Sequence, residues 1–266
     1  MKKKTFFLSS SRADFDLIST IYNLLKKNKY LLPKIILTGT NLDKKYTQKK
    51  KFLNSNFKIN VDLKSSNIKD FSKVLSSYFL KFYNFLYKKK PNVVVILGDR
   101  YETLIFAICA KFLDCKIIHI HGGEKTKGSL DNIWRDMITK ISDYHFTSLE
   151  IYRKRVIKLI DSSKNVFNFG SIGAYNIKNI NKKKIFQNIK FKKKILVSYH
   201  SSTLSISKSR KDLLEMLAAL TKFKECFILF TYPGHDIESD FIIKSLKKFN
   251  IVNKNSLLIK KESSYN

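Results

Sequence analysis

The feature that most constrains the fold is a regular alternation of two kinds of segment. Short continuous runs of β-branched and aliphatic residues, such as "NVVVIL" at 92–97, are typical of strands buried on both faces of a parallel sheet. Longer segments with apolar residues at helical spacing, such as 13–27, stand between these runs. We therefore expect an α/β protein in which parallel strands and helices alternate in doubly wound units.

This alternation occurs twice along the chain, which predicts two domains. Residues 1–178 contain the first set of segments, and residues 190–266 begin a second set with three expected strands. The stretch 176–194 consists mainly of lysine, asparagine and isoleucine, and we interpret it as the connection. A complete unit of this kind needs of order 150 residues. We therefore expect the second domain to be incomplete, with the chain ending part-way through it.

The chain carries a large positive charge, with 52 lysine and arginine residues against 21 aspartate and glutamate residues and a formal net charge of +31. Such a charge indicates nucleic-acid binding when the basic residues gather on one face. Here lysine runs such as "KKNK", "YKKKP" and "FKKKI" are spread through the chain, mostly at expected helix ends and in linkers. We interpret them as solvated surface lysines and expect no nucleic-acid partner. The positive field still favours an anionic substrate.

Several classes of protein are disfavoured by what the sequence lacks. No apolar run approaches the roughly 18 to 20 residues that span a bilayer, and Phe6–Leu8 is too short for the apolar part of a signal peptide. We therefore expect a cytoplasmic protein without a membrane partner. Cys109, Cys115 and Cys226 lack CxxC spacing, which supports neither disulfides nor zinc. The glycine motifs of nicotinamide-binding domains and of P-loop NTPases are also absent, and we expect no cofactor.

Acidic residues follow two of the expected strands at the positions where open α/β sheets bind ligands. Asp99 comes after the run 92–97 and Gly98. It either caps the next helix or directs a carboxylate into a cleft. Glu124 comes after a glycine pair that ends the strand expected at 116–121.

The strand before Glu124 carries His119 and His121 on one face, because alternate residues of a strand point the same way. This spacing also allows a metal site. No third or fourth ligand accompanies the two histidines, so we expect no metal and interpret the strand as the support that presents Glu124.

Two further patterns leave alternatives open, and a third predicts a helix cap. Asp131 and Arg135 are four residues apart on an expected helix, and form either an ordinary ion pair or part of a site. The serines at 9–11, followed by Arg12 and a helix start, either hold a phosphate or cap the helix. Thr147 and Glu150 have the spacing of a capping box for the helix that follows.

Many short motifs over residues 5 to about 240 resemble, in the same order, those of the UDP-N-acetylglucosamine 2-epimerase family. The similarity is greatest to its hydrolysing branch, which serves sialic-acid-type and legionaminic-acid-type sugars. The motifs are "SRADF", "GDRYETLIFA", "HIHGGE", "GSLDNIWR", "ITKISDYHF", "YRKRVI", "VFNFGSIG", "VSYHS" and "FTYPG".

This resemblance implies two Rossmann-like domains in the arrangement called GT-B, with the active site between them. It also implies a reaction without metal or redox cofactor. A base removes the proton on carbon 2 of UDP-N-acetylglucosamine while UDP leaves carbon 1, and rehydration of the resulting 2-acetamidoglucal gives N-acetylmannosamine. Such chemistry needs more than one carboxylate, because one accepts a proton while another delivers a proton or guides water.

The family's motifs also imply roles for particular residues. By motif position the catalytic residues are Asp99, Glu124, Asp131 and His200, of which His200 assists the leaving diphosphate. The residues expected to bind the nucleotide-sugar substrate are Arg12, Arg100, Arg135, His121 and Ser201. We also expect a homodimer.

Two departures from the family bear on this interpretation. Asp136 stands where hydrolysing members usually have a histidine after the arginine, and the family's segment that grips the nucleotide lies beyond residue 266. A GDP-linked N-acetylhexosamine of the legionaminic-acid pathway is therefore an alternative substrate. An inactive, truncated remnant that binds a sugar nucleotide weakly is another alternative.

Overall fold

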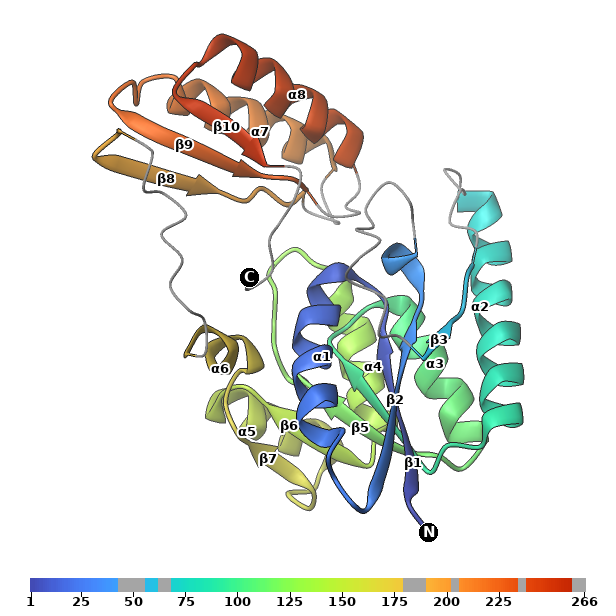
Figure 1. Ribbon diagram of the computed structural model, residues 1–266. Coiled ribbons are helices and arrows are strands. Elements are labelled where there is room, and N and C mark those ends of the chain that lie inside the picture. Colours follow the sequence, from blue (N-terminus) through green and yellow to red (C-terminus); the bar gives the residue numbers. More distant parts are fainter. Residues whose placement is uncertain (43–55, 62–67, 179–189, 202–205, 234–237, 260–266) are drawn as a thin grey trace. The chain divides into compact units, whose positions relative to one another are not determined.

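The computed structural model describes residues 1–42, 56–61, 68–178, 190–201, 206–233 and 238–259 (Figure 1). The chain divides into two compact units, the first comprising Met1–Thr126 with Asp131–Asn179 and the second Lys127–Leu130 with Ile180–Asn266.

The first unit is built on a parallel sheet of seven strands in the order β3-β2-β1-β4-β5-β6-β7. The strands are β1 (Lys3–Ser9), β2 (Leu31–Leu37), β3 (Phe57–Lys58), β4 (Val93–Leu97), β5 (Lys116–Ile120), β6 (Tyr144–Thr147) and β7 (Val166–Asn168). The chain runs outward from β1 to β3, then returns to β4 beside β1 and continues the other way. The carboxyl ends of β1 and β4 therefore flank the switch point at which open α/β sheets bind ligands.

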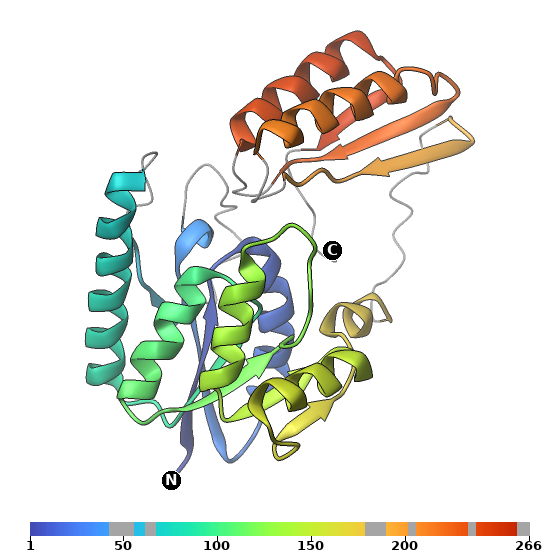
Figure 2. The ribbon, with the colours of Figure 1, turned by 180° about the vertical axis from the view of Figure 1, so that it is seen from behind.

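Helices cover both faces of this sheet (Figures 1 and 2). They are α1 (Arg12–Leu25), α2 (Ile68–Lys89), α3 (Tyr101–Phe112), α4 (Asp131–Ile141), α5 (Glu150–Ile160) and α6 (Ile172–Lys178), with a short 3-10 turn at Gly39–Asn41. Helices α2, α3 and α4 share one apolar core with the sheet, which includes Phe82, Phe106 and Ile117. Helix α1 packs on the opposite face against Phe7 and Val95.

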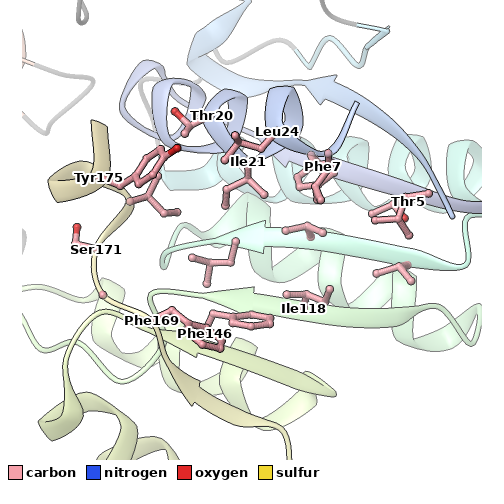
Figure 3. Close-up of a pocket in the computed structure, with 17 residues that line it drawn as sticks. Thr5, Phe7, Thr20, Ile21, Leu24, Ile118, Phe146, Phe169, Ser171 and Tyr175 are labelled. Atoms are coloured by element: carbon pink, nitrogen blue, oxygen red, sulfur yellow. The ribbon is translucent and has the colours of Figure 1, made fainter. Parts of the chain in front are cut away.

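The α1 face of the sheet contains an apolar cavity of about 430 Å³. Figure 3 shows its wall, in which Ile21 and Leu24 of α1 face Ile118 and Phe146 of the sheet, and Phe169 closes one side. None of the residues expected to act on a substrate lines this cavity. It belongs to the packing of the sheet face rather than to the candidate site.

The second unit contains a parallel sheet of three strands in the order β10-β9-β8. Its elements are β8 (Lys193–Val197), α7 (Ile206–Leu220), β9 (Cys226–Thr231), α8 (Ser239–Val252) and β10 (Ser256–Ile259). Leu213, Phe230 and Leu246 lie in its core. The predicted α/β class, with parallel sheets in two units, is confirmed.

Two elements of the first unit were not expected, and one expected cap is wrong. Strand β6 and helix α6 are present in addition to the strands and helices expected from the sequence. Thr147 ends β6, and its hydroxyl donates to the carbonyls of Leu149, at 3.4 Å, and Phe167, at 3.2 Å. Helix α5 begins at Glu150 without a side-chain cap, so the Thr147–Glu150 capping box does not form. Across the part of the chain that the structure describes, no helix is long and apolar enough to cross a membrane.

Candidate active site

Asp99 lies at the switch point of the first sheet and does not cap a helix. Gly98, with φ +82°, turns the chain after β4, and the N-cap position of α3 falls on Arg100. The Asp99 carboxylate forms an ion pair with the Arg135 guanidinium. Asp99 was expected either to cap the next helix or to direct its carboxylate into a cleft, and the structure excludes the cap.

Arg135 joins the ends of two neighbouring strands. It comes from α4, and its side chain is 6% exposed. One nitrogen, Nη2, contacts Asp99 after β4, while Nη1 donates to the carbonyl of Glu124 after β5 at 2.6 Å. These contacts join residues far apart in the sequence, so Arg135 is part of the candidate site.

The environment of Asp99 shifts its proton affinity. Burial raises the pKa of its carboxyl to about 6, although the Arg135 charge acts in the opposite direction. The carboxylates of Asp131, the first residue of α4, and of Asp14 raise this pKa further. A carboxyl group with a pKa close to neutral pH is a stronger base than an ordinary aspartate and is well suited to proton transfer.

Glu124 is held by contacts on one carboxylate oxygen. Ser148, just after β6, donates its hydroxyl proton to Oε1 at 2.6 Å, and His121 Nδ1 lies 3.3 Å from the same oxygen. These two contacts orient the Glu124 carboxylate through Oε1. Ser148 was missed by sequence reasoning, and its only signal is its place directly after a strand.

His119 lies within β5 and His121 directly follows it, and the two side chains have different surroundings. His119 is fully buried, its Nε2 donates to the carbonyl of Gly98 at 2.8 Å, and its Nδ1 lies 3.1 Å from Thr139 Oγ1. Burial lowers the pKa of His119 to about 3, so the imidazole is neutral. His121 has a φ of +63°, and burial lowers its pKa as well. In the described part of the chain, no group of three or more histidine, cysteine or acidic residues is placed to hold a metal ion.

The serines after β1 serve as a helix cap rather than as a free phosphate cradle. Ser11 is the N-cap of α1 and forms a capping box with Asp14. The Asp14 carboxylate accepts hydrogen bonds from the backbone N–H and the hydroxyl of both Ser10 and Ser11, at 2.6 to 3.1 Å. Asp14 was also missed, although the Ser-x-x-Asp spacing was visible. Arg12 is the first residue of α1, and its side chain lies outside the described atoms.

Arg100, the N-cap residue of α3, forms an ion pair with Glu102 in the first turn of that helix. Its Nε donates to Glu102 Oε1 at 2.6 Å, and Glu102 is 1% exposed. Burial alone would lower the pKa of the Arg100 guanidinium, but the Glu102 carboxylate outweighs that effect and the pKa is raised. Arg100 is therefore a permanent cation next to Asp99.

His200 and Ser201 belong to the second unit, where they follow β8. His200 is exposed, and its Nε2 lies 3.3 Å from Ser198 Oγ. The structure therefore brings together Asp99, Glu124, Arg135 and His121, with Asp131 and Arg100 beside them. The participation of His200 and Ser201 stays a prediction.

Together the fold and the site define a Rossmann-like α/β protein with a carboxylate and arginine cluster at the carboxyl edge of its first sheet. Solved structures share this fold. The UDP-GlcNAc 2-epimerase from Neisseria meningitidis bound to UDP-GlcNAc matches with a TM-score of 0.78 at 17% identity, over 100% of this chain and 74% of that one. The UDP-N-acetylglucosamine 2-epimerase from Rickettsia bellii matches with a TM-score of 0.75 at 20% identity, over 97% of this chain and 69% of that one.

The sequence comparisons identify the family. The family model described as UDP-N-acetylglucosamine 2-epimerase matches residues 23–261. The GDP/UDP-N,N'-diacetylbacillosamine 2-epimerase (hydrolyzing) of Campylobacter jejuni is 32% identical over 96% of this chain and 68% of its own length. Polysialic acid biosynthesis protein P7 of Escherichia coli is 31% identical over 93% of this chain and 66% of its own length. The chain belongs to the UDP-N-acetylglucosamine 2-epimerase family, and it spans about two thirds of the length of these two relatives.

Proposed function

We propose that this chain is a hydrolysing nucleotide-sugar 2-epimerase, and that its substrate is UDP-N-acetylglucosamine. The observation that carries the proposal is the double contact of Arg135, which fixes the Asp99 carboxyl and the Glu124 backbone on adjacent strand ends. Membership of the family and the name of the Campylobacter jejuni relative, a hydrolysing 2-epimerase, support the reaction class.

The proposed reaction begins with an elimination. Asp99, whose raised pKa makes it the stronger base, takes the proton from carbon 2 of the sugar. The electrons of that C–H bond form a double bond between carbons 1 and 2, and the bond between carbon 1 and the diphosphate oxygen breaks. UDP leaves with the electron pair, and the sugar becomes 2-acetamidoglucal.

Rehydration completes the reaction. Glu124 guides a water molecule, whose oxygen bonds to carbon 1 while one of its protons passes to the Glu124 carboxylate. A proton derived from solvent is added to carbon 2 on the face opposite to Asp99. One water is consumed, and the products are N-acetylmannosamine and UDP. In this proposal Asp131 keeps the pKa of Asp99 high, and His200 assists the departure of UDP. Arg12, Arg100, Arg135, His121 and Ser201 bind the substrate.

A second candidate substrate is a UDP- or GDP-linked N,N'-diacetylbacillosamine or a related N-acetylhexosamine. The relative from Campylobacter jejuni, 32% identical, supports this candidate because its name includes both nucleotides. The catalytic carboxylates would act on the same two carbons of such a sugar. Contacts with the nucleobase (uracil or guanine) and with the substituent on carbon 4 of the sugar would decide between the substrates.

The test is an assay of nucleotide release by the purified chain with UDP-N-acetylglucosamine, GDP-N-acetylglucosamine and UDP-N,N'-diacetylbacillosamine. We expect UDP release from the first, with one deuterium at carbon 2 of the product when the reaction is run in D₂O. Asp99→Asn is the control that lacks the base. Release no faster than this control with all three substrates would overturn the enzyme proposal. Release from only one of the other two would reassign the substrate.

A further inference from the structure

An arginine outside the expected site contacts the loop that carries Glu124. Arg155 comes from α5, and its Nη1 donates to the carbonyl of Gly123 at 3.0 Å and to that of Glu124 at 2.9 Å. Its other nitrogen, Nη2, donates to Asp136 Oδ2 at 2.6 Å. Asp136 follows Arg135 on α4, so this one guanidinium connects the loop, α4 and α5.

We propose that Arg155, oriented by Asp136, is a positioning residue that fixes Glu124 for the reaction. This inference rests on the proposed function in one respect, which is the role of Glu124. The Glu124 carbonyl accepts hydrogen bonds from two guanidinium groups, Arg135 at 2.6 Å and Arg155 at 2.9 Å. Charged donors form stronger hydrogen bonds than neutral ones, and two of them restrict the orientation of the peptide before Lys125.

The loop needs such support because it contains the glycine pair at 122–123. Glycine restricts the backbone less than any other residue, so a glycine pair by itself leaves the direction of the next side chain poorly defined. Helix α5 limits this freedom by close packing, since a Cβ on Gly123 would lie 2.5 Å from the carbonyl oxygen of Tyr152. Arg155, one turn further along α5, adds the directional contacts.

Asp136 supplies the charge that makes a partly buried position for Arg155 favourable. The two side chains are only 26% and 31% exposed, for Arg155 and Asp136 respectively. An arginine between two carbonyls without a counter-charge would lose hydration without full compensation. Asp136 also fixes the rotation of the guanidinium plane, because Nη1 faces the carbonyls when Nη2 faces the carboxylate.

The test compares four variants of the full chain. Arg155→Lys keeps the charge but removes the planar fork that reaches three acceptors. Asp136→Asn removes the counter-charge, and the double variant removes both. Glu150→Gln is the matched control, because it breaks an ion pair of the same helix, Glu150 with Arg153 at 3.0 Å, that does not contact the loop.

Two measurements are made on each variant, amide hydrogen exchange of residues 121–126 and the kinetics of UDP release. We expect faster exchange in 121–126 for Arg155→Lys and Asp136→Asn, with exchange in the rest of α5 unchanged. We also expect kcat to fall about 10- to 100-fold with KM within about twofold, because a misplaced catalytic group affects the chemical step. The double variant should resemble the more severe single one, and Glu150→Gln should resemble the wild type.

The proposal is overturned if exchange in 121–126 stays at the wild-type rate, or if it rises equally along the whole of α5, which would indicate a purely structural role. A rise in KM at constant kcat also contradicts it. If the wild type releases no nucleotide, the proposed function fails, and the exchange measurement alone then decides whether Arg155 and Asp136 position the loop.

Discussion

Arg135 is the single residue on which the geometry of the candidate site depends most. Its guanidinium has acceptors in two separate peptide segments, the Asp99 carboxylate and the Glu124 carbonyl, and it is almost fully buried. A lysine has one point of attachment and cannot contact both segments in the same way. The residue therefore acts as a link between the two strand ends and not only as a charge.

We accordingly expect Arg135→Lys to lower kcat/KM by about 100-fold or more, since it loosens both catalytic carboxylates at once. Steady-state kinetics of nucleotide release provide the measurement. Arg153→Lys is the control, because its guanidinium contacts Glu150 and the carbonyl of Val166, and it should stay within about twofold of wild type. An Arg135→Lys variant with normal kcat/KM would show that the charge alone suffices.

The pKa of Asp99 predicts the pH dependence of the reaction. Because burial raises this pKa to about 6, the carboxylate form that accepts the proton is lost as the pH falls through about 6. We expect kcat/KM to be constant above about pH 7 and to fall close to tenfold per unit below about pH 5.5. The measurement is a pH profile in buffers of constant ionic strength. A profile that is flat from pH 5 to pH 8 would exclude Asp99 as the base.

At the scale of elements, the strands were predictable where burial on both faces gives a continuous apolar run, as in β4 and β5. Strand β6 and helix α6 were not, because each is too short to give a periodic pattern. The four residues of β6 become a strand through pairing with β5 and β7, which no local pattern reveals. The seven residues of α6 contain Gly173 and too few turns for a periodic signal.

In the candidate site, too, some features were predictable from the sequence and others were not. Asp99 and Glu124 were placed at the sheet edge because the carboxyl ends of parallel strands meet there. Their partners were not predictable, because they are distant in sequence. Arg135 is 36 residues from Asp99, and Ser148 is 24 residues from Glu124. Local spacing suggested a cap at Thr147, but contacts with another segment determined the arrangement there.

A glycine comparison tests how closely α5 packs on the Glu124 loop. Gly123 and Gly170 have similar dihedral angles, with φ of +81° and +85°, but a Cβ at Gly170 would meet nothing within 4 Å. Gly170→Ala should therefore cost only the backbone strain, about 1 to 2 kcal/mol of unfolding free energy. Gly123→Ala should cost about 1 to 3 kcal/mol more, because its Cβ meets the backbone of α5. Urea denaturation measures both, and equal costs would mean that α5 yields easily.

At the scale of the whole molecule, buried ionisable groups make the stability of the first unit depend on pH. His119 and His145 are buried, and burial lowers their pKa values to about 3 and about 4. In the unfolded chain both histidines bind a proton below about pH 6.5. Between about pH 4 and 6 the unfolded state thus holds two protons on these histidines that the folded state lacks. Asp99 acts oppositely, since the folded state keeps a carboxyl proton that the unfolded state has released.

These two protons minus the one on Asp99 predict that the free energy of unfolding rises by about 1.4 kcal/mol per pH unit between pH 4 and 6. Burial also lowers the pKa of His121, which makes this rise steeper. His119→Gln should lower this slope by about 1.4 kcal/mol per unit, because it removes one histidine proton. Asp99→Asn should raise the slope by about the same amount, because it removes the opposing proton. Urea denaturation followed by the fluorescence of Trp134, the one tryptophan of the chain, reports on the first unit at each pH. Slopes that do not move in opposite directions in the two variants would contradict the assigned protonation states.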